Sequence, residues 1–323
     1  LTSPADWRLI GRSQPRVDIP AKVRGAPVFG MDVDLPGILY AAIRQAPVFG
    51  AEVGGIANEA AARAVEGVRD VVAIDGKAVA VVAESWWRAE QAVGLLDITW
   101  SRTGSEATTT ADLSARLHAA LTSPSPYVHS DDGDVDGALA TPAARVIESV
   151  YDVPFVTHAC MEPINATVVV REDGTVEAWV SSQSPLGVRT GVRRGTGWAG
   201  LEPAGVTCNI TMNGGAFGRR SDLDVSAQAA YLATRHRGRP IKLIWSREED
   251  IGRGLYRAHA AARLRAALGP DGLPIGYDAR VASQSVIASV AERNLPLNPG
   301  PNGDSLTVEG LDKLHYAIPS RRV

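Results

Sequence analysis

The stretch VTCNITMNGGAFGRR, residues 206–220, runs from an alternating strand pattern into a glycine turn. Its first seven residues place apolar and polar side chains on opposite faces, which indicates a half-buried β-strand. The next run, residues 221–236, predicts an α-helix with Ser221 or Asp222 as its N-cap. IKLIW, residues 241–245, predicts a further strand. The local order is therefore strand, glycine turn, helix, strand.

A glycine turn in this place can present backbone N–H groups at a helix N-terminus, where an anion is favoured. Arg219 and Arg220 could add charge-assisted hydrogen bonds to a phosphate. The known phosphate loops fit badly: the dinucleotide fingerprint needs a glycine where Met212 or Asn213 stands, and a P-loop needs Gly-Lys-Ser/Thr. Taken alone, the turn favours a purely structural role, with Phe217 buried beneath it.

Composition limits the classes of protein to which the chain can belong. The 323 residues, of which 45% are apolar, suffice for two domains. The balance of 33 basic and 36 acidic residues gives a net charge of −3, which argues against a nucleic-acid binder. Two cysteines, Cys160 and Cys208, supply neither a disulfide framework nor an iron–sulfur or zinc set, so we expect no metal ligated directly by this chain.

The order of patterns predicts an α+β protein with two domains. Residues 1–25 are expected to be an N-terminal extension and residues 26–103 a first domain that mixes short strands with two helices. Residues 104–145 are expected to be a linker with one helix, and residues 146–323 a second domain.

Two local predictions matter for the site. Residues 27–53 predict two short strands around the Pro36-Gly37 turn. Residues 165–170 and 175–182 predict a β-hairpin with an Asp-Gly turn. Gln183 follows at the end of the second strand of this hairpin. A glutamine there is most often a solvated turn residue.

Six segments in order resemble the molybdenum-cofactor subunit of the xanthine dehydrogenase and aldehyde oxidase family. The branch they resemble is that of isoquinoline 1-oxidoreductase β subunits and membrane-associated aldehyde dehydrogenases of bacteria. The segments are RVDIPAKVRGAPVFGMDVDLPGILYAA (16–42), VAVVAESWWRAEQAV (79–93), HACMEP (158–163), SSQSPLGVR (181–189), NGGAFGRR (213–220) and KLIWSREEDI (242–251). The resemblance implies an α/β hammerhead-like domain followed by a mixed α/β molybdopterin-binding domain.

The resemblance also implies roles for individual residues. The glycine turn would lie against molybdopterin, with Phe217 and Gly218 at the metal. The residues expected around the cofactor are Gly214, Gly215, Ala216, Phe217, Gly218, Arg219 and Arg220. Gln183 would donate a hydrogen bond to the apical oxo ligand, because its NH₂ group is a donor that does not titrate. The catalytic set is thus Gln183, Phe217 and Gly218.

Two features of the motif qualify these roles. Ala216 stands where the family has a third glycine, and a positive φ there would cost about 1 kcal/mol or more. His158, Met161 and Glu162 are interpreted as scaffold beneath the cofactor, with contact to the substrate as a second interpretation.

The implied function is the oxidation of an aldehyde or N-heterocycle with oxygen from water. The implied cofactor is molybdenum–molybdopterin, in bacteria as the cytosine dinucleotide. The family's catalytic glutamate lies in a Gly-x-Gly-Glu-Pro-Gly segment that is absent here, so the chain resembles the middle of the family subunit. We therefore expect a companion chain that carries this glutamate, and a separate [2Fe–2S] subunit.

Two alternative functions and the compartment stay open from the sequence. The chain could be an orphaned fragment or assembly subunit of the same fold that binds no molybdenum. It could also be an ordinary nucleotide binder, a hypothesis that depends on the glycine turn alone. The compartment is open between the bacterial cytoplasm and a periplasmic or inner-membrane-associated complex.

Overall fold

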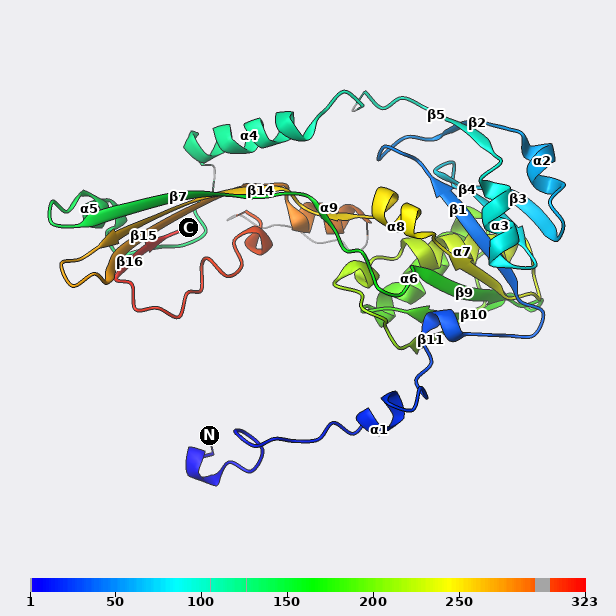
Figure 1. Cartoon of the computed structure of the whole chain (residues 1–323), viewed down its shortest axis with the longest axis horizontal. Coiled ribbons are helices and arrows are strands. Elements are labelled where there is room, and N and C mark those ends of the chain that lie inside the picture. The colour runs from blue at the N-terminus through cyan, green and yellow to red at the C-terminus, as the bar shows by residue number, and fades with distance from the viewer. Residues whose placement is uncertain (1, 105, 126, 294–302) are drawn as a thin grey trace.

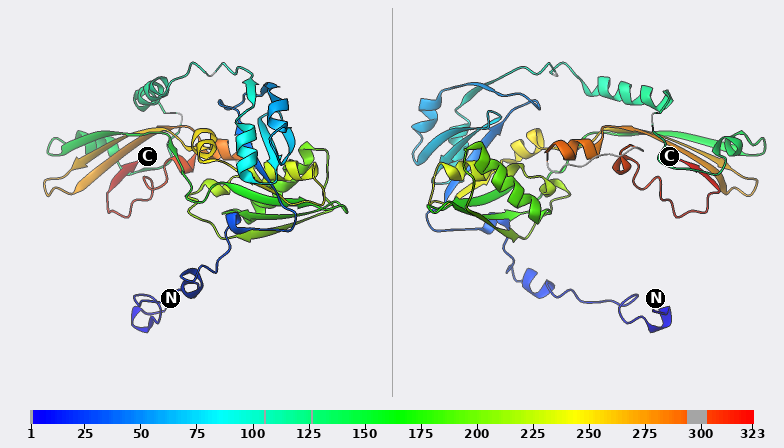
Figure 2. Two further views of the ribbon diagram at one scale, coloured as in Figure 1. Left: turned by 45° about the vertical axis from the view of Figure 1, so that its right-hand side comes forward. Right: turned by 180° about the vertical axis from the view of Figure 1, so that it is seen from behind.

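The computed structural model describes residues 2–104, 106–125, 127–293 and 303–323. Two lobes and an N-terminal arm are visible in Figure 1. The first lobe is built on a seven-stranded sheet and the second on a five-stranded sheet. The arm, residues 2–27, stands away from both lobes in each view of Figure 2 and is almost entirely exposed.

The seven-stranded sheet has the order β11-β10-β9-β12-β1-β4-β3. Its strands are β1 (Leu39–Gln45), β3 (Val68–Ile74), β4 (Ala78–Ala83), β9 (Asn165–Val170), β10 (Thr175–Ser181), β11 (Gly205–Thr211) and β12 (Ile241–Ile244). The sheet joins distant parts of the sequence, because β1 pairs in parallel with β12. Strands from both expected domains therefore share one sheet in a mixed α/β fold.

Helices cover both faces of this sheet. The pair α6 (Pro185–Trp198) and α7 (Asp224–Thr234) packs on one face, and α2 (Glu59–Arg63) and α3 (Trp86–Val93) pack on the other. β4 reads AVAVVA and is buried at every position, as a strand covered on both faces should be. Beside this lobe, β2 (Val53–Ala57) pairs with β5 (Asp97–Trp100).

The second lobe is a five-stranded sheet of order β6-β16-β15-β14-β7. Its strands are β6 (Asp131–Asp132), β7 (Arg145–Val153), β14 (Ala260–Leu268), β15 (Pro274–Ser283) and β16 (Ser320–Arg322). Helices α4 (Thr110–Thr122) and α5 (Val135–Ala140) pack on this sheet (Figure 1). Residues 104–145, expected to be a linker, thus contribute two helices and a strand to the second lobe.

Short elements complete the described chain. They are α1 (Ile19–Lys22), α8 (Arg247–Arg253), α9 (Val286–Arg293), β8 (Val156–Thr157), β13 (Tyr256–Arg257) and the 3-10 turns η1 (Pro4–Asp6), η2 (Gly30–Asp32), η3 (Arg219–Ser221) and η4 (Ser305–Thr307). β8 and β13 pair with each other.

The structure confirms the β9–β10 hairpin and corrects two other predictions. Residues 27–36, all of which the structure describes, form no strand: the Asp32 carboxylate accepts the Phe29 N–H at 2.9 Å and closes η2 there instead. Helix α7 begins at Asp224 rather than at residue 221, because η3 intervenes. The glycine turn is therefore not itself the N-terminus of an α-helix.

Candidate functional site

The glycine turn, residues 213–218, connects β11 to η3 through left-handed backbone. Gly215 has φ 74°, Phe217 φ 54° and Gly218 φ 99°. Ala216 does not adopt positive φ, so the penalty considered for that position does not arise. The penalty falls on Phe217 instead, because left-handed backbone at a residue other than glycine costs roughly 1–2 kcal/mol.

The outer side of the turn presents groups that the chain itself does not use. Phe217 is 64% exposed rather than buried beneath the turn. In the part of the chain that the structure describes, no acceptor takes the N–H groups of Gly215, Ala216 and Phe217. Consecutive amide donors in a turn of this kind form a site for an anion or another acceptor. A ligand at the exposed ring would lie next to these donors, although Ala216 itself is only 7% exposed.

Gln183 supplies a fourth donor next to the turn. It follows β10, and its Oε1 accepts the Gly218 N–H at 3.0 Å. Its own backbone N–H donates to the Arg220 carbonyl at 3.0 Å. These contacts fix the amide plane and leave Nε2 as the remaining donor, for which the described residues offer no acceptor. The side chain is exposed, so Nε2 is available to a ligand.

The HACMEP segment lies along the turn and pairs with it through the backbone. The Met161 and Glu162 N–H groups donate to the carbonyls of Gly215 and Gly214 at 3.0 and 2.7 Å. Met161 is 74% exposed beside Gly215. Ala159, at φ 45°, adds a second strained residue to this segment.

His158 reaches the turn from the same segment. Its Nδ1 lies 3.0 Å from the Leu255 carbonyl oxygen, so Nδ1 carries the proton and Nε2 is an acceptor when the ring is neutral. Nε2 would lie 3.8 Å from a Cβ placed on Gly218. His158, Met161, Gln183 and Phe217, predicted from separate segments, therefore meet around one turn.

Glu162 lies on the opposite, inner side of the turn. It is buried, with Oε2 accepting the Gly214 N–H and Oε1 accepting the Met31 N–H, each at 3.0 Å. Both oxygens of the carboxylate are used by the protein. Its contacts support the scaffold interpretation over contact with the substrate.

Arg219 and Arg220 also face inward, although the sequence suggested that they would surround the cofactor. The Arg219 guanidinium, 2% exposed, pairs with Asp224 at 2.5 Å and lies 5.2 Å from the centre of the Trp245 ring. Arg220 donates to the carbonyls of Ser181, Glu162 and Pro163. Nearby acidic and carbonyl oxygens thus bind both cations inside the protein.

Three further residues at the site were not predicted from sequence. Arg247 donates to the Cys160 and Met161 carbonyls and holds the HACMEP segment from α8. Asp250 is buried close to these arginines, and burial raises the pKa of its carboxyl. Lys242 is buried on β12. A lysine inside the apolar run IKLIW was the signal that could have identified it.

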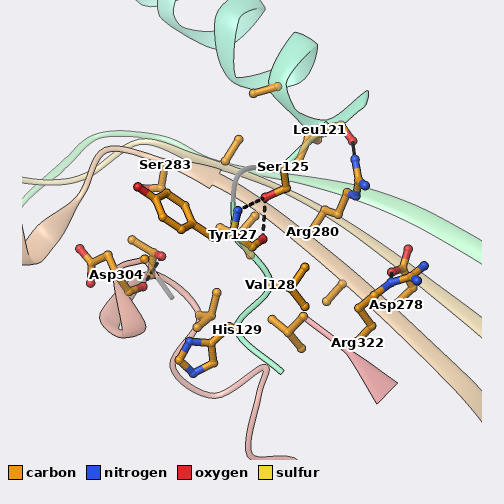
Figure 3. Close-up of a pocket in the computed structure, with 18 of the residues that line it drawn as sticks. Leu121, Ser125, Tyr127, Val128, His129, Asp278, Arg280, Ser283, Asp304 and Arg322 are labelled. Carbon is orange, nitrogen blue, oxygen red and sulfur yellow. Dashed lines mark hydrogen bonds and ion pairs between the residues drawn. The ribbon is translucent and has the colours of Figure 1, made fainter. Parts of the chain in front are cut away.

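Cavities indicate from which side a ligand can reach the turn. The space enclosed beneath it, lined by Ser181, Ser182, Arg219 and Arg220 among others, is about 10 Å³ and holds no more than a water molecule. A larger cavity of about 310 Å³ lies in the second lobe (Figure 3), where α4 faces β15. No predicted site residue lines that cavity. The space beneath the turn is therefore too small for a cofactor.

Two features are absent from the described residues. They include no group of three or more His, Cys, Asp or Glu side chains placed to hold a metal ion. None of their helices has the length and apolar character needed to cross a bilayer.

The chain is similar to known proteins along most of its length. Residues 118–296 match the model of the molybdopterin cofactor-binding domain. The chain is 33% identical to isoquinoline 1-oxidoreductase subunit beta of Brevundimonas diminuta, over 81% of this chain and 34% of that protein. It is 27% identical to a membrane-bound aldehyde dehydrogenase [pyrroloquinoline-quinone] of Gluconacetobacter polyoxogenes, with the same coverage. The chain thus spans about a third of the length of these relatives.

Solved structures share the fold. The aldehyde oxidoreductase of Desulfovibrio gigas superposes with a TM-score of 0.69 and 21% identity, over 100% of this chain and 39% of that chain. Quinoline 2-oxidoreductase of Pseudomonas putida 86 gives a TM-score of 0.60 and 19% identity, over 84% and 39%. The match to the domain model covers more than half of the chain. The chain therefore belongs to the molybdopterin cofactor-binding domain family of the xanthine dehydrogenases and aldehyde oxidoreductases.

Proposed function

We propose that the outer side of the glycine turn binds molybdopterin and that the chain forms one wall of the catalytic site of a molybdenum hydroxylase. The observation that carries the proposal is the set of unused donors at Gly215, Ala216, Phe217 and Gln183, which lie together beside the exposed Phe217 ring. A pterin offers ring nitrogens, a carbonyl oxygen and phosphate oxygens to such donors. Two strained residues, Ala159 and Phe217, at this one place are typical of a functional site.

The chain's own residues would bind and shield rather than react. When bound, the molybdenum centre supplies two-electron oxidation with oxygen taken from water. Gln183 would donate from Nε2 to the cofactor, and its contact with Gly218 would keep that donor oriented. Phe217 would exclude water from the metal face. His158 would offer Nε2 as an acceptor at the edge of the same surface.

The substrate class and the partners follow from the relatives. Their names cover an N-heterocycle and aldehydes, so we propose an aldehyde or an N-heterocyclic substrate. We propose that a companion polypeptide supplies the catalytic glutamate and the rest of the cofactor pocket. A [2Fe–2S] subunit would accept the electrons, and the cofactor would be the cytosine dinucleotide form.

Metal and pterin content of the purified assembly tests the proposal. We expect about one molybdenum per chain, measured by plasma mass spectrometry, together with a pterin detected by fluorescence after oxidation. Molybdenum missing from an intact, active assembly would refute the proposal and favour the alternative of a subunit that binds none.

A substitution at Gln183 tests the outer donor directly. Gln183→Glu keeps an oxygen for the Gly218 N–H but removes the Nε2 donor, so we expect kcat to fall about 10²–10³-fold while molybdenum content is retained. Gln91→Glu, an exposed glutamine on α3, is the matched control and should leave kcat unchanged. Equal kcat values for the two variants would show that the Gln183 donor has no role in the site.

A further inference from the structure

Residues 28–33, here called the N-terminal strap, cross behind the glycine turn and bind the segments that form it. The Met212 N–H donates to the Val28 carbonyl at 3.0 Å, next to an isolated bridge between Phe29 and Met212. The Gly30 N–H donates to Ser181 Oγ at 3.0 Å. These contacts join the strap to the end of β11 and the end of β10.

The strap fits closely against the sheet. A Cβ on Gly30 would lie 2.3 Å from Asn165 Oδ1 and 2.6 Å from Ser181 Oγ, so this position has no room for a side chain. From β12, the buried Lys242 ammonium donates to the carbonyls of Met31 and Val33, at 2.5 and 2.7 Å. The strap is therefore held on both its amide and its carbonyl sides.

Glu162 is the link between the strap and the glycine turn. One carboxylate oxygen accepts the Met31 N–H and the other accepts the Gly214 N–H. Asn165 Nδ2 at 3.1 Å, Ser181 Oγ at 3.3 Å and Arg220 Nη2 at 3.4 Å complete its surroundings. An ionised carboxylate accepts hydrogen bonds only, so it can satisfy donors on both sides at once. Gly214 allows this approach, since a Cβ there would lie 2.5 Å from Glu162 Cβ.

We propose that Glu162 is a positioning residue that couples the N-terminal strap to the glycine turn. Docking of the strap fixes Glu162, Glu162 fixes Gly214, and the donors at Gly215, Ala216 and Phe217 are thereby oriented. The strap is then part of the cofactor site without touching the cofactor. This inference depends on the proposed function for its effect on cofactor binding, but the coupling itself can be measured without cofactor.

Amide hydrogen exchange of the 323-residue chain tests the coupling. Gly30→Ala displaces the strap, and we expect the Gly214, Gly218, Met161 and Glu162 amides to exchange about tenfold faster as a result. Gly197→Ala is the matched control, because a Cβ on Gly197 meets no atom within 4 Å. Unchanged exchange in residues 213–218, while the strap itself loosens, would overturn the proposal.

A second pair of variants guards against a Gly30→Ala chain that fails to fold. Glu162→Gln replaces one acceptor oxygen by an NH₂ group that must face a donor, so we expect faster exchange in the strap and the turn together. Glu162→Asp retains the charge and should recover part of the protection. Glu249→Gln is the control: Glu249 is another buried carboxylate, and it accepts the Gln45 N–H at 3.1 Å far along the chain. If Glu249→Gln speeds amide exchange in the turn as much as Glu162→Gln does, Glu162 is merely structural and the proposal is wrong.

Cofactor content separates this inference from the proposed function. In the molybdenum-loaded assembly, Gly30→Ala should lower the molybdenum per chain about tenfold, whereas Gly197→Ala should not. If Gly30→Ala speeds amide exchange in the turn but leaves the molybdenum content unchanged, the proposed effect of the strap on cofactor binding is wrong. If the wild-type assembly holds no molybdenum, the proposed function fails while the exchange result still decides the coupling.

Discussion

The two sides of the glycine turn differ in how their polar groups are used. On the inner side, Glu162, Arg219 and Arg220 are each less than 10% exposed and are bound to protein groups. On the outer side, amide donors have no acceptor in the described chain and Phe217 is 64% exposed. The charges therefore hold the turn, and neutral donors are left for a ligand.

This difference separates positioning from binding around a single turn. A ligand held by backbone amides and one glutamine amide meets no titratable group of the turn. Its binding by these groups would not vary with pH through their ionisation. The variants below test whether the division between the two sides is as sharp as the contacts indicate.

The largest effect is expected from the inner side. Arg220→Ala leaves the buried Glu162 carboxylate without its ion-pair partner and removes one donor from each of three carbonyls, so we expect a loss of about 3–5 kcal/mol in the free energy of unfolding. Urea denaturation measures it. Arg189→Ala, an exposed arginine on α6, should change stability by less than about 0.5 kcal/mol. Similar losses for the two variants would contradict the assignment of Arg220 to the inner side.

A smaller change in stability is expected from the outer side. Phe217→Gly relieves left-handed strain of about 1–2 kcal/mol, and the greater freedom of glycine when unfolded offsets about 0.5–1 kcal/mol of that gain. We expect stability within about 1 kcal/mol of wild type, with molybdenum content reduced about tenfold.

The matched control for this variant is Asp75→Gly. Asp75 also has positive φ, 48°, but lies in the exposed turn between β3 and β4. Asp75→Gly should gain less relief, because Asp tolerates left-handed backbone better than Phe, and should cause no loss of metal. A Phe217→Gly protein that keeps full molybdenum content would show that the ring does not shape the cofactor site.

The smallest effect concerns pH. Burial lowers the pKa of the Lys242 ammonium from its ordinary value of 10.5, and the carboxylates of Asp34, Asp32 and Glu162 oppose this shift. Between the lowered pKa and 10.5 the unfolded chain holds more protons than the folded chain, so stability rises with pH in that window. Lys242→Met removes this contribution.

Urea midpoints at pH 7 to 10 measure the prediction for Lys242. The difference in unfolding free energy between wild type and Lys242→Met should shift in favour of the wild type as pH rises. A constant difference would mean that the Lys242 pKa is the same in both states.

Local patterns predicted most of the elements that position the site. The Asp173-Gly174 turn gave the β9–β10 hairpin, and strict alternation gave β11. The start of α7 was misplaced because Ser221 and Asp222 have the composition of an N-cap. In the structure Asp222 pairs with Arg293, 71 residues away, and does not cap the helix. Such a contact depends on the tertiary fold and leaves no local signal.

Site membership was easier to predict than the direction in which side chains point. The residues predicted from His158 to Phe217 do meet around one turn, and their roles toward a cofactor stay predictions. Arg219 looked like a phosphate ligand, although Asp224, five residues later, was a local sign of its true partner. The strap was missed because Met31 and Glu162 are joined by a hydrogen bond that no spacing rule describes.

The parallel pairing of β1 with β12 at the centre of the large sheet affects biosynthesis. Leu39 lies opposite Ile241, so one edge of β1 stays unpaired during synthesis until β12 has left the ribosome. Contacts of such long sequence separation form slowly, and open strand edges invite pairing with other nascent chains. A sheet that formed before β12 was synthesised would thus be incomplete and would expose that edge of β1.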